Sequence, residues 1–176
     1  MRPGKRQLSS SQVKEILKAF PDLKAWRAGL HHGSIIYFEL GDRIRDRPLR
    51  GEAELRGSAY LGIWADDWAI RQHGGLIASS KTVTRAVMEG DVQRLVSGLA
   101  ICGFDLEPGT GTARVWFQDG LSVAVDFRAE QDDNDLIQLH VPDGRIISLS
   151  KGLGFYVSDD VDETLLLHWR ERERRA

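Results

Sequence analysis

The 176-residue sequence predicts an α+β fold in which two antiparallel β units pack together as a sandwich or a pair of half-barrels. Short runs rich in Ile, Tyr, Phe and Trp alternate with turn signals in both halves of the chain. The two β regions also resemble each other, and segments of helical spacing precede, separate and follow them. We expect a single domain over residues 1–176, because 41% hydrophobic residues are enough for one core.

The first predicted element is a helix that begins after Ser9. Ser9 and Gln12 have the spacing of a capping box, and Pro21 marks the end of the helix. One apolar stripe runs along it, made of Val13, Ile16, Leu17 and Phe20.

The first β region is predicted to hold strands at residues 35–40, 60–64, 68–71 and 76–79. The charged stretch 43–57 contains Pro48 and has no clear period, so we expect a loop or a ragged edge hairpin there.

Residues 81–98 return to helical spacing and predict one or two short helices between the halves. The second β region then holds strands at residues 99–106, 113–118, 121–127, 136–141 and 145–149. Asp119-Gly120 between two of these runs is a hairpin signal. A C-terminal helix is expected from about Asp160, because Val161, Leu165 and Trp169 have helical spacing.

The two β regions match in residue class and spacing. Residues 36–41 (IYFELG) match 115–120 (VWFQDG), which aligns Phe38 with Phe117 at equivalent buried positions. Farther along, residues 68–79 match 137–148 at the same internal spacing, and residues 28–30 match 97–99 upstream. We therefore predict repeat units over about 34–81 and 112–151, related by a pseudo-twofold axis. A non-repeated sheet of similar composition is the alternative.

The pattern Gly98-Leu99, then Val115 to Val123, an acidic loop and Pro142-Asp143-Gly144 resembles a family of small uncharacterised bacterial domains. Some members of that family are regarded as immunity proteins encoded near polymorphic toxins. The resemblance covers about residues 53–152 and implies a protein-binding role. It supplies no catalytic residues that could be assigned here.

The overall charge favours neither nucleic acid nor anionic lipid, because 24 basic residues face 26 acidic ones. We expect no nucleic-acid binding, no secretion signal and no membrane span. The single cysteine, Cys102, lies in an apolar run and predicts a buried, inert thiol. The lack of a cysteine pair fits a reducing compartment, so we expect a cytoplasmic location.

Residue patterns for catalysis and metal binding are weak. The five histidines lack the spacing of a zinc site, and no Gly-x-Ser-x-Gly motif or phosphate-binding loop occurs. We therefore predict no cofactor, no metal and no catalytic residue. The acidic group near Asp132 lacks the pattern of a calcium loop and is interpreted as a solvated loop.

The predicted binding surface combines tryptophans with carboxylates near two turns. Its candidate residues are Trp64, Asp66, Asp67, Trp68, Asp132, Asp133 and Asp135. They predict a non-catalytic binding protein, an immunity or regulatory protein that meets a basic protein partner. For the two tryptophans, the alternative is that both face the core.

A second hypothesis is a small-molecule binding module. Its ligand would occupy the cleft between the two β repeats, against Trp64, Trp68 and Trp116.

Overall fold

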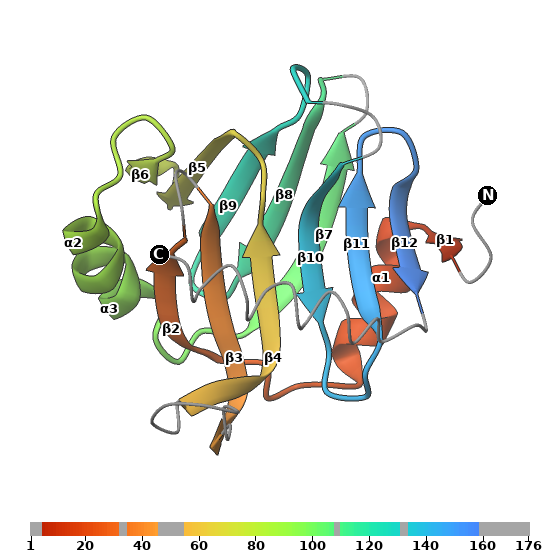
Figure 1. Ribbon diagram of the computed structural model, residues 1–176, viewed down its shortest axis with the longest axis horizontal. Coiled ribbons are helices and arrows are strands. Elements are labelled where there is room, and N and C mark those ends of the chain that lie inside the picture. The colour runs from red at the N-terminus through yellow and green to blue at the C-terminus, as the bar shows by residue number, and fades with distance from the viewer. Residues whose placement is uncertain (1–4, 32–34, 46–54, 108–109, 131–133, 159–176) are drawn as a thin grey trace, which may run out of the picture.

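The computed structural model describes residues 5–31, 35–45, 55–107, 110–130 and 134–158, and it confirms the α+β class (Figure 1). Its strands form two antiparallel sheets. The strands are β1 (Lys5–Leu8), β2 (Ala25–Leu30), β3 (Ile36–Arg45), β4 (Leu55–Ile63), β5 (Asp67–Gln72), β6 (Gly75–Ser79), β7 (Ile101–Glu107), β8 (Thr112–Phe117), β9 (Leu121–Asp126), β10 (Asp135–His140), β11 (Ile146–Ser150) and β12 (Gly154–Ser158). The helices are α1 (Ser10–Lys18), α2 (Arg85–Val87), the π-helical turn η1 (Met88–Val92) and α3 (Gln93–Val96).

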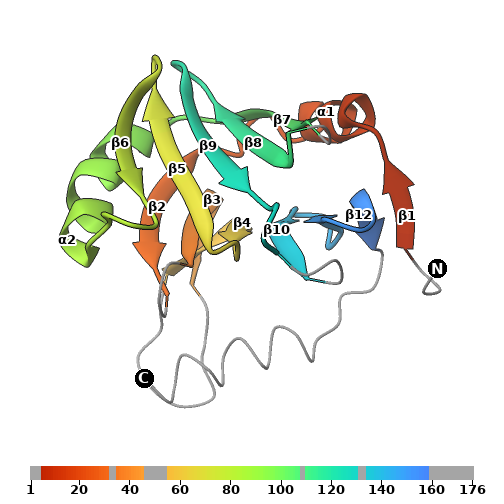
Figure 2. The same cartoon turned by 90° about the horizontal axis from the view of Figure 1, so that it is seen from above.

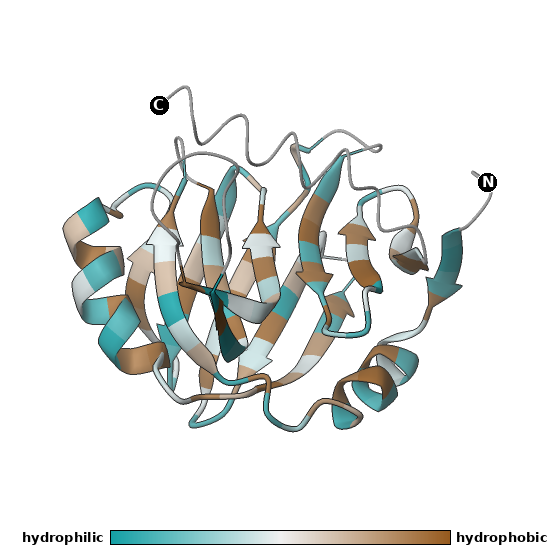
Figure 3. Cartoon of the chain, turned by 60° about the horizontal axis from the view of Figure 1, so that its bottom comes forward, coloured by the Kyte–Doolittle hydropathy of each residue, from teal (hydrophilic) through white to brown (hydrophobic). Residues whose placement is uncertain are grey.

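The seven-stranded sheet has the order β1-β12-β11-β10-β4-β3-β2, and the five-stranded sheet has the order β6-β5-β9-β8-β7. The two sheets face each other, and the helical segments flank them at opposite sides (Figure 2). Apolar and polar residues alternate along many strands, as the banding in Figure 3 shows. The inward residues form one core, in which Phe38 of the large sheet meets Phe117 of the small one with ring centroids 5.3 Å apart.

Local signals in the sequence explain the start of the first helix and one tight hairpin turn. Ser9 accepts a hydrogen bond from the Gln12 backbone N–H, and the Gln12 side chain accepts one from the Ser9 backbone N–H, so the predicted capping box is present. Asp119 and Gly120 both have positive φ, at 55° and 67°. This is the conformation of a type I′ hairpin turn, which joins β8 to β9 as predicted.

The two halves of the chain have the same strand order. β2, β3 and β4 form a meander, after which the β5–β6 hairpin crosses to the other sheet and pairs with β9. In the second half β7, β8 and β9 form a meander, and the β10–β11 hairpin crosses back and pairs with β4. The last hairpin of each half therefore pairs with the meander of the other half. This is the neighbour order expected of a duplication.

Hydrogen bonds near Lys24 and Ala100 mark the pseudo-twofold axis. These two residues form a bridge with each other. The Ala25 N–H donates to Leu99 O at 2.9 Å, and the Ile101 N–H donates to Leu23 O at 3.3 Å. The helices obey the same relation, because α1 packs against β7 while η1 and α3 pack against β2.

The residue-level alignment of the repeats is wrong by two positions in the first anchor. Ile70 pairs with Val123, and its counterpart Leu139 pairs with Leu61, so Leu61 corresponds to Val123. Phe38 pairs with Leu61, whereas Val115 pairs with Val123. The counterpart of Phe38 is therefore Val115, and Phe117 corresponds to Leu40. A shift of two residues leaves every side chain on the same face, so the apolar pattern did not reveal it.

The pairing corrects one further expectation and decides another. Ala28 pairs with Phe38 and Phe104 pairs with Val115, so the counterpart of Ala28 lies in β7 and not at Ser97. In the stretch 43–57 the hairpin alternative holds for the described residues, because β3 and β4 extend into it past a register shift and Arg43 pairs with Gly57. Residues 46–54 and the expected C-terminal helix lie outside the described residues.

Cys102 is exposed, which contradicts the prediction of a buried thiol. The pairing of β7 with β8 skips Cys102, which forms a bulge between Ile101 and Gly103. Trp26 occupies the same bulge position in β2. Because a bulge interrupts the alternation of the strand, the thiol points outward although its neighbours in sequence are apolar.

We expect Cys102 to react with a disulfide reagent without unfolding of the protein, but slowly at neutral pH. Partial burial raises the pKa of its thiol above the ordinary value of 9.0. Since the thiolate is the nucleophile, the labelling rate should rise about tenfold per pH unit below that pKa. Stopped-flow labelling of native and guanidinium-unfolded protein between pH 7 and pH 9 measures this. Labelling that follows only global unfolding contradicts the exposed position.

Candidate functional site

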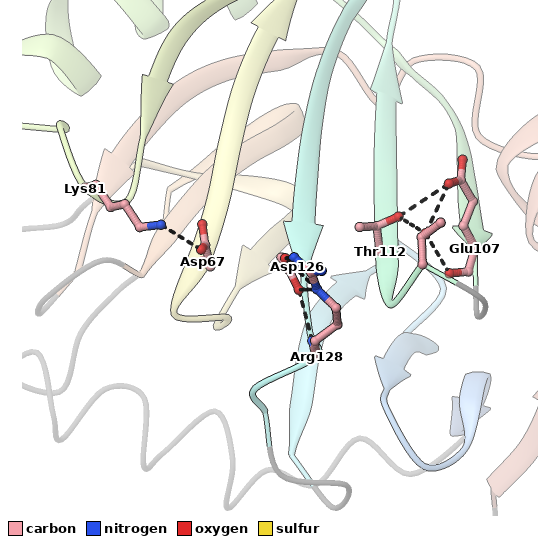
Figure 4. Close-up of polar contacts among 7 residues, drawn as sticks. Asp67, Lys81, Glu107, Thr112, Asp126 and Arg128 are labelled. Carbon is pink, nitrogen blue, oxygen red and sulfur yellow. Dashed lines mark hydrogen bonds and ion pairs between the residues drawn. The ribbon is translucent and has the colours of Figure 1, made fainter.

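A row of polar side chains crosses the outer face of the five-stranded sheet (Figure 4). Asp67 of β5 lies directly opposite Asp126 of β9, which lies opposite Thr112 of β8, which lies opposite Glu107 of β7. The strand register therefore gathers three carboxylates and a hydroxyl from four strands. Thr112 belongs to a small network at the far end, where the hydroxyl of Thr110 donates to the Glu107 carboxylate at 3.2 Å.

Each of the two opposed aspartates has one cation beside it. Lys81 Nζ lies 3.0 Å from Asp67 Oδ2, and the Arg128 guanidinium grips Asp126 with its Nε and Nη2 nitrogens. Hydrogen bonds from Arg128 lower the pKa of the Asp126 carboxyl, and the same contact raises the pKa of Arg128. Asp126 is therefore a carboxylate at neutral pH.

Both cations lie at the protein surface, because the Lys81 side chain is 76% exposed and the Arg128 side chain 71% exposed. Exposed ion pairs contribute about 0–1 kcal/mol each.

The turn before β5 meets the loop after β9 at one end of this row. The Asp66 backbone N–H donates to the Glu130 carboxylate at 2.7 Å. Lys151 secures the same loop by donating to Arg128 O at 3.2 Å and to Glu130 O at 3.0 Å. We name Asp66, Asp67, Asp126 and Glu130 the acidic corner.

The predicted site residues divide among several places. Asp66, which is exposed, and Asp67 lie in the acidic corner. Asp132 and Asp133 lie outside the described residues. Asp135 instead accepts hydrogen bonds from Tyr156 and Gln138 of the seven-stranded sheet.

The two tryptophans do not join the acidic corner. The prediction that Trp68 belongs to the binding surface is wrong. Trp68 is 1% exposed and lies in the core, as the alternative interpretation held. Its alternation with Asp67 along β5 points it inward when Asp67 points outward. Trp64 lies on the outer face of the seven-stranded sheet, beside Gly62.

The ligand cleft lined by three tryptophans is not formed. Trp68 is in the core, Trp64 is on the outer face of the large sheet, and Trp116 donates through its indole N–H to Asp105 on the outer face of the small sheet at 2.6 Å. The three rings therefore face three different environments. The space between the sheets holds packed apolar side chains, among them Phe38, Leu61, Val115 and Phe117.

Sequence reasoning missed Asp126 and Lys81, whereas Glu130 belongs to the acidic group near Asp132 that the sequence had indicated. Asp126 ends a strand whose partner β5 belongs to the other half of the chain. The hairpin exchange between the repeats would have revealed this pairing, but only with the correct register.

Within the described residues, no group of three or more His, Cys, Asp or Glu side chains is placed to hold a metal ion. No helix in that part of the chain is both long and apolar enough to cross a membrane.

Comparison of the chain with protein-family models, curated proteins and solved structures finds no match.

Proposed function

We propose that this protein is a non-catalytic binding protein that recognises a basic protein partner through the acidic corner. The observation that carries this proposal is the direct opposition of Asp67 and Asp126 on an exposed sheet face. Lys81 and Arg128 each offset one of these charges through an exposed ion pair, and such pairs contribute only about 0–1 kcal/mol. A partner's basic groups can replace these cations at small cost, which suits a surface that binds through charge.

The surrounding charge supports a basic partner. The segments 66–67 and 126–135 carry seven acidic residues and one basic residue, Arg128. Lys81 and Lys151 also contact this surface, so acidic residues exceed basic ones there by four. Complementary charge across an interface chiefly raises the association rate and the specificity of binding.

The adjoining surface has the shape for close contact. Ala69 of β5 and Ala124 of β9 lie opposite each other next to the acidic row, so these two positions carry small side chains. Trp116 stands farther along this face, with the Arg114 guanidinium 5.0 Å from its ring centroid. Aromatic and arginine side chains are frequent energetic centres of interfaces.

The role we propose is regulatory or that of an immunity protein, in a cytoplasmic setting. The resemblance of the sequence to bacterial immunity domains supports this role. No observation favours the small-molecule module, because the three tryptophans it requires are separated.

The test is a triple variant, Asp66→Asn, Asp67→Asn and Asp126→Asn, assayed against the basic protein that the wild-type chain captures from its source cells. We expect association at low salt to slow about tenfold or more, with a flatter salt dependence. The triple variant Glu15→Gln, Asp22→Asn and Asp91→Asn is the matched control. It removes the same charge, and Glu15 and Asp91 also sit in exposed ion pairs.

Association rates are measured by surface plasmon resonance between 20 and 500 mM NaCl. Over this range the Debye length changes by about threefold or more, so charge attraction is screened to different degrees. The control variant should associate like the wild type. The proposal fails if both triple variants slow association equally, if neither does, or if the wild-type chain captures no basic protein.

A further inference from the structure

The hairpin of β3 and β4 extends beyond the rest of the seven-stranded sheet (Figure 1). β2 pairs with β3 no farther than Leu40, and β10 pairs with β4 no farther than Tyr60. Past these residues, in the part of the chain that the structure describes, the two strands pair only with each other, as Arg43 does with Gly57. We name residues 41–45 and 55–58 the projecting ribbon.

The projecting ribbon adds little to the core. Its two large apolar side chains, Ile44 and Leu55, are 51% and 46% exposed. A two-stranded ribbon without a third strand is at best marginally stable in water. The projecting ribbon therefore suits contact with another molecule better than it suits stabilisation of the fold.

Exposed arginines lie on the projecting ribbon and on the strand beside it. Arg43 and Arg45 are two residues apart along β3, so their side chains share one face, and Arg27 lies on β2. Within the described part of the chain, none of these three forms an ion pair with a carboxylate. Other exposed cations do, because Arg94 pairs with an aspartate at 3.0 Å and Arg128 grips another.

Aromatic rings hold two of these arginines in place. The Arg43 guanidinium lies 5.0 Å from the ring centroid of Trp26, and the Arg27 guanidinium lies 5.9 Å from that of Tyr37. A guanidinium that stacks on a ring keeps its charge and its N–H donors, which lie in its own plane. Both groups are therefore positioned to bind anionic oxygen atoms.

The local charge is positive although the chain as a whole is not. Residues 24–27 and 41–57 carry seven basic and four acidic residues, counting the stretch 46–54 outside the described residues. The overall balance of 24 basic and 26 acidic residues, from which we expected no nucleic-acid binding, conceals this excess. β4 runs from the projecting ribbon to Ile63, just before Asp66, so the ribbon and the acidic corner lie at opposite ends of that strand (Figure 1).

We propose that the projecting ribbon binds a nucleic-acid duplex, with Arg43 and Arg45 on phosphate oxygens and Arg27 beside them. Guanidinium forks bind phosphate oxygens through two parallel hydrogen bonds. A two-stranded β-ribbon fits the major groove of duplex DNA, which is about 12 Å wide. Phosphate contacts carry no sequence information, so we expect binding without sequence preference. This inference does not depend on the proposed function, because it concerns the other end of β4.

The test is fluorescence anisotropy with a fluorescein-labelled DNA duplex of about 20 base pairs, at 50 to 200 mM NaCl. We expect saturable binding by the wild type that weakens as salt rises. In the variant Arg43→Gln/Arg45→Gln the affinity at 50 mM NaCl should fall about tenfold or more. The slope of log K against log salt should also become shallower by about two, because each phosphate contact contributes about 0.9.

Arg85→Gln/Arg94→Gln is the matched control. It removes the same charge from two exposed cations that form ion pairs with Glu89 and Asp91. This control variant should bind the duplex like the wild type. Both variants should keep the melting temperature of the wild type, because all four side chains are exposed.

Three results would overturn the proposal. The first is the absence of saturable binding by the wild type at 50 mM NaCl. The second is an equal loss of affinity in the two variants, which would show diffuse attraction without a site. The third is displacement of the duplex by poly-L-glutamate or by a single DNA strand, at equal charge concentration, as effective as displacement by unlabelled duplex. The projecting ribbon would then select for negative charge alone and not for a duplex.

Discussion

Replacing Phe38 with alanine is expected to lower the free energy of unfolding by about 3–5 kcal/mol. Phe38 is fully buried, and its ring packs against Phe117 of the opposite sheet with a centroid distance of 5.3 Å and an interplanar angle of 54°. Truncation removes the packing contacts of the ring and leaves a cavity between the two sheets. Each sheet is held in place by its own backbone hydrogen bonds. Such a cavity can collapse only partly.

The measurement is equilibrium unfolding in urea, followed by circular dichroism. Phe38→Leu, which preserves an apolar side chain of intermediate size, should cost under about 1.5 kcal/mol and keeps the prediction testable if the alanine variant does not fold. Leu76→Ala is the exposed control, because Leu76 is 53% exposed and its truncation should change stability by about 0.5 kcal/mol or less. An equal loss from Phe38→Ala and Leu76→Ala would show that the two sheets do not pack through Phe38.

Replacing Gly57 with alanine is expected to destabilise the protein by about 1–3 kcal/mol or more. A Cβ atom at Gly57 would lie 2.6 Å from both Leu40 N and Ala59 O, and closer still to Leu40 O. These are backbone atoms within the sheet, so they cannot move aside as a flexible side chain could. The Gly57 N–H also donates to the buried Glu39 carboxylate at 2.7 Å, and a shift of the backbone would strain that bond.

Gly90→Ala is the matched control for this substitution. A Cβ atom there would have no neighbour within 4 Å, and Gly90 lies in the helical segment η1. Alanine is favoured over glycine inside a helix by about 0.5–1 kcal/mol, so this variant should be more stable than the wild type. Thermal unfolding of the two variants side by side gives the comparison. If both substitutions shift the melting temperature in the same direction, the close backbone approach at Gly57 is wrong.

The pairing of Asp67 with Asp126 shows why only part of the candidate site could be predicted. Asp66 and Asp67 stood out in sequence because they occupy a turn between tryptophans. Asp126 had no comparable signal, because a carboxylate at a strand end is ordinary. What makes it part of the acidic corner is the pairing of β5 with β9 across the two halves of the chain.

Local interactions fixed the features that the sequence alone determined. The capping box at Ser9, the Asp119-Gly120 turn and most strand positions depend on residues a few places apart, so short-range patterns report them. The class of the fold followed from these elements and from the repeated order of apolar runs. β1, β2 and β12 escaped detection, because their sequences KRQL, AWRAGL and GFYVS lack a clear two-residue alternation.

Tertiary structure decided strand register, hairpin exchange and exposure. Apolar periodicity specifies which face a residue occupies but not its partner, so a shift of two residues between Phe38 and Val115 was invisible to it. The exposure of Cys102 depends on a bulge that only the pairing of β7 with β8 creates. The acidic corner exists because each half of the chain completes the other's sheet. That contact joins residues about 60 positions apart, such as Asp66 and Glu130, and it is fixed by packing of the whole core.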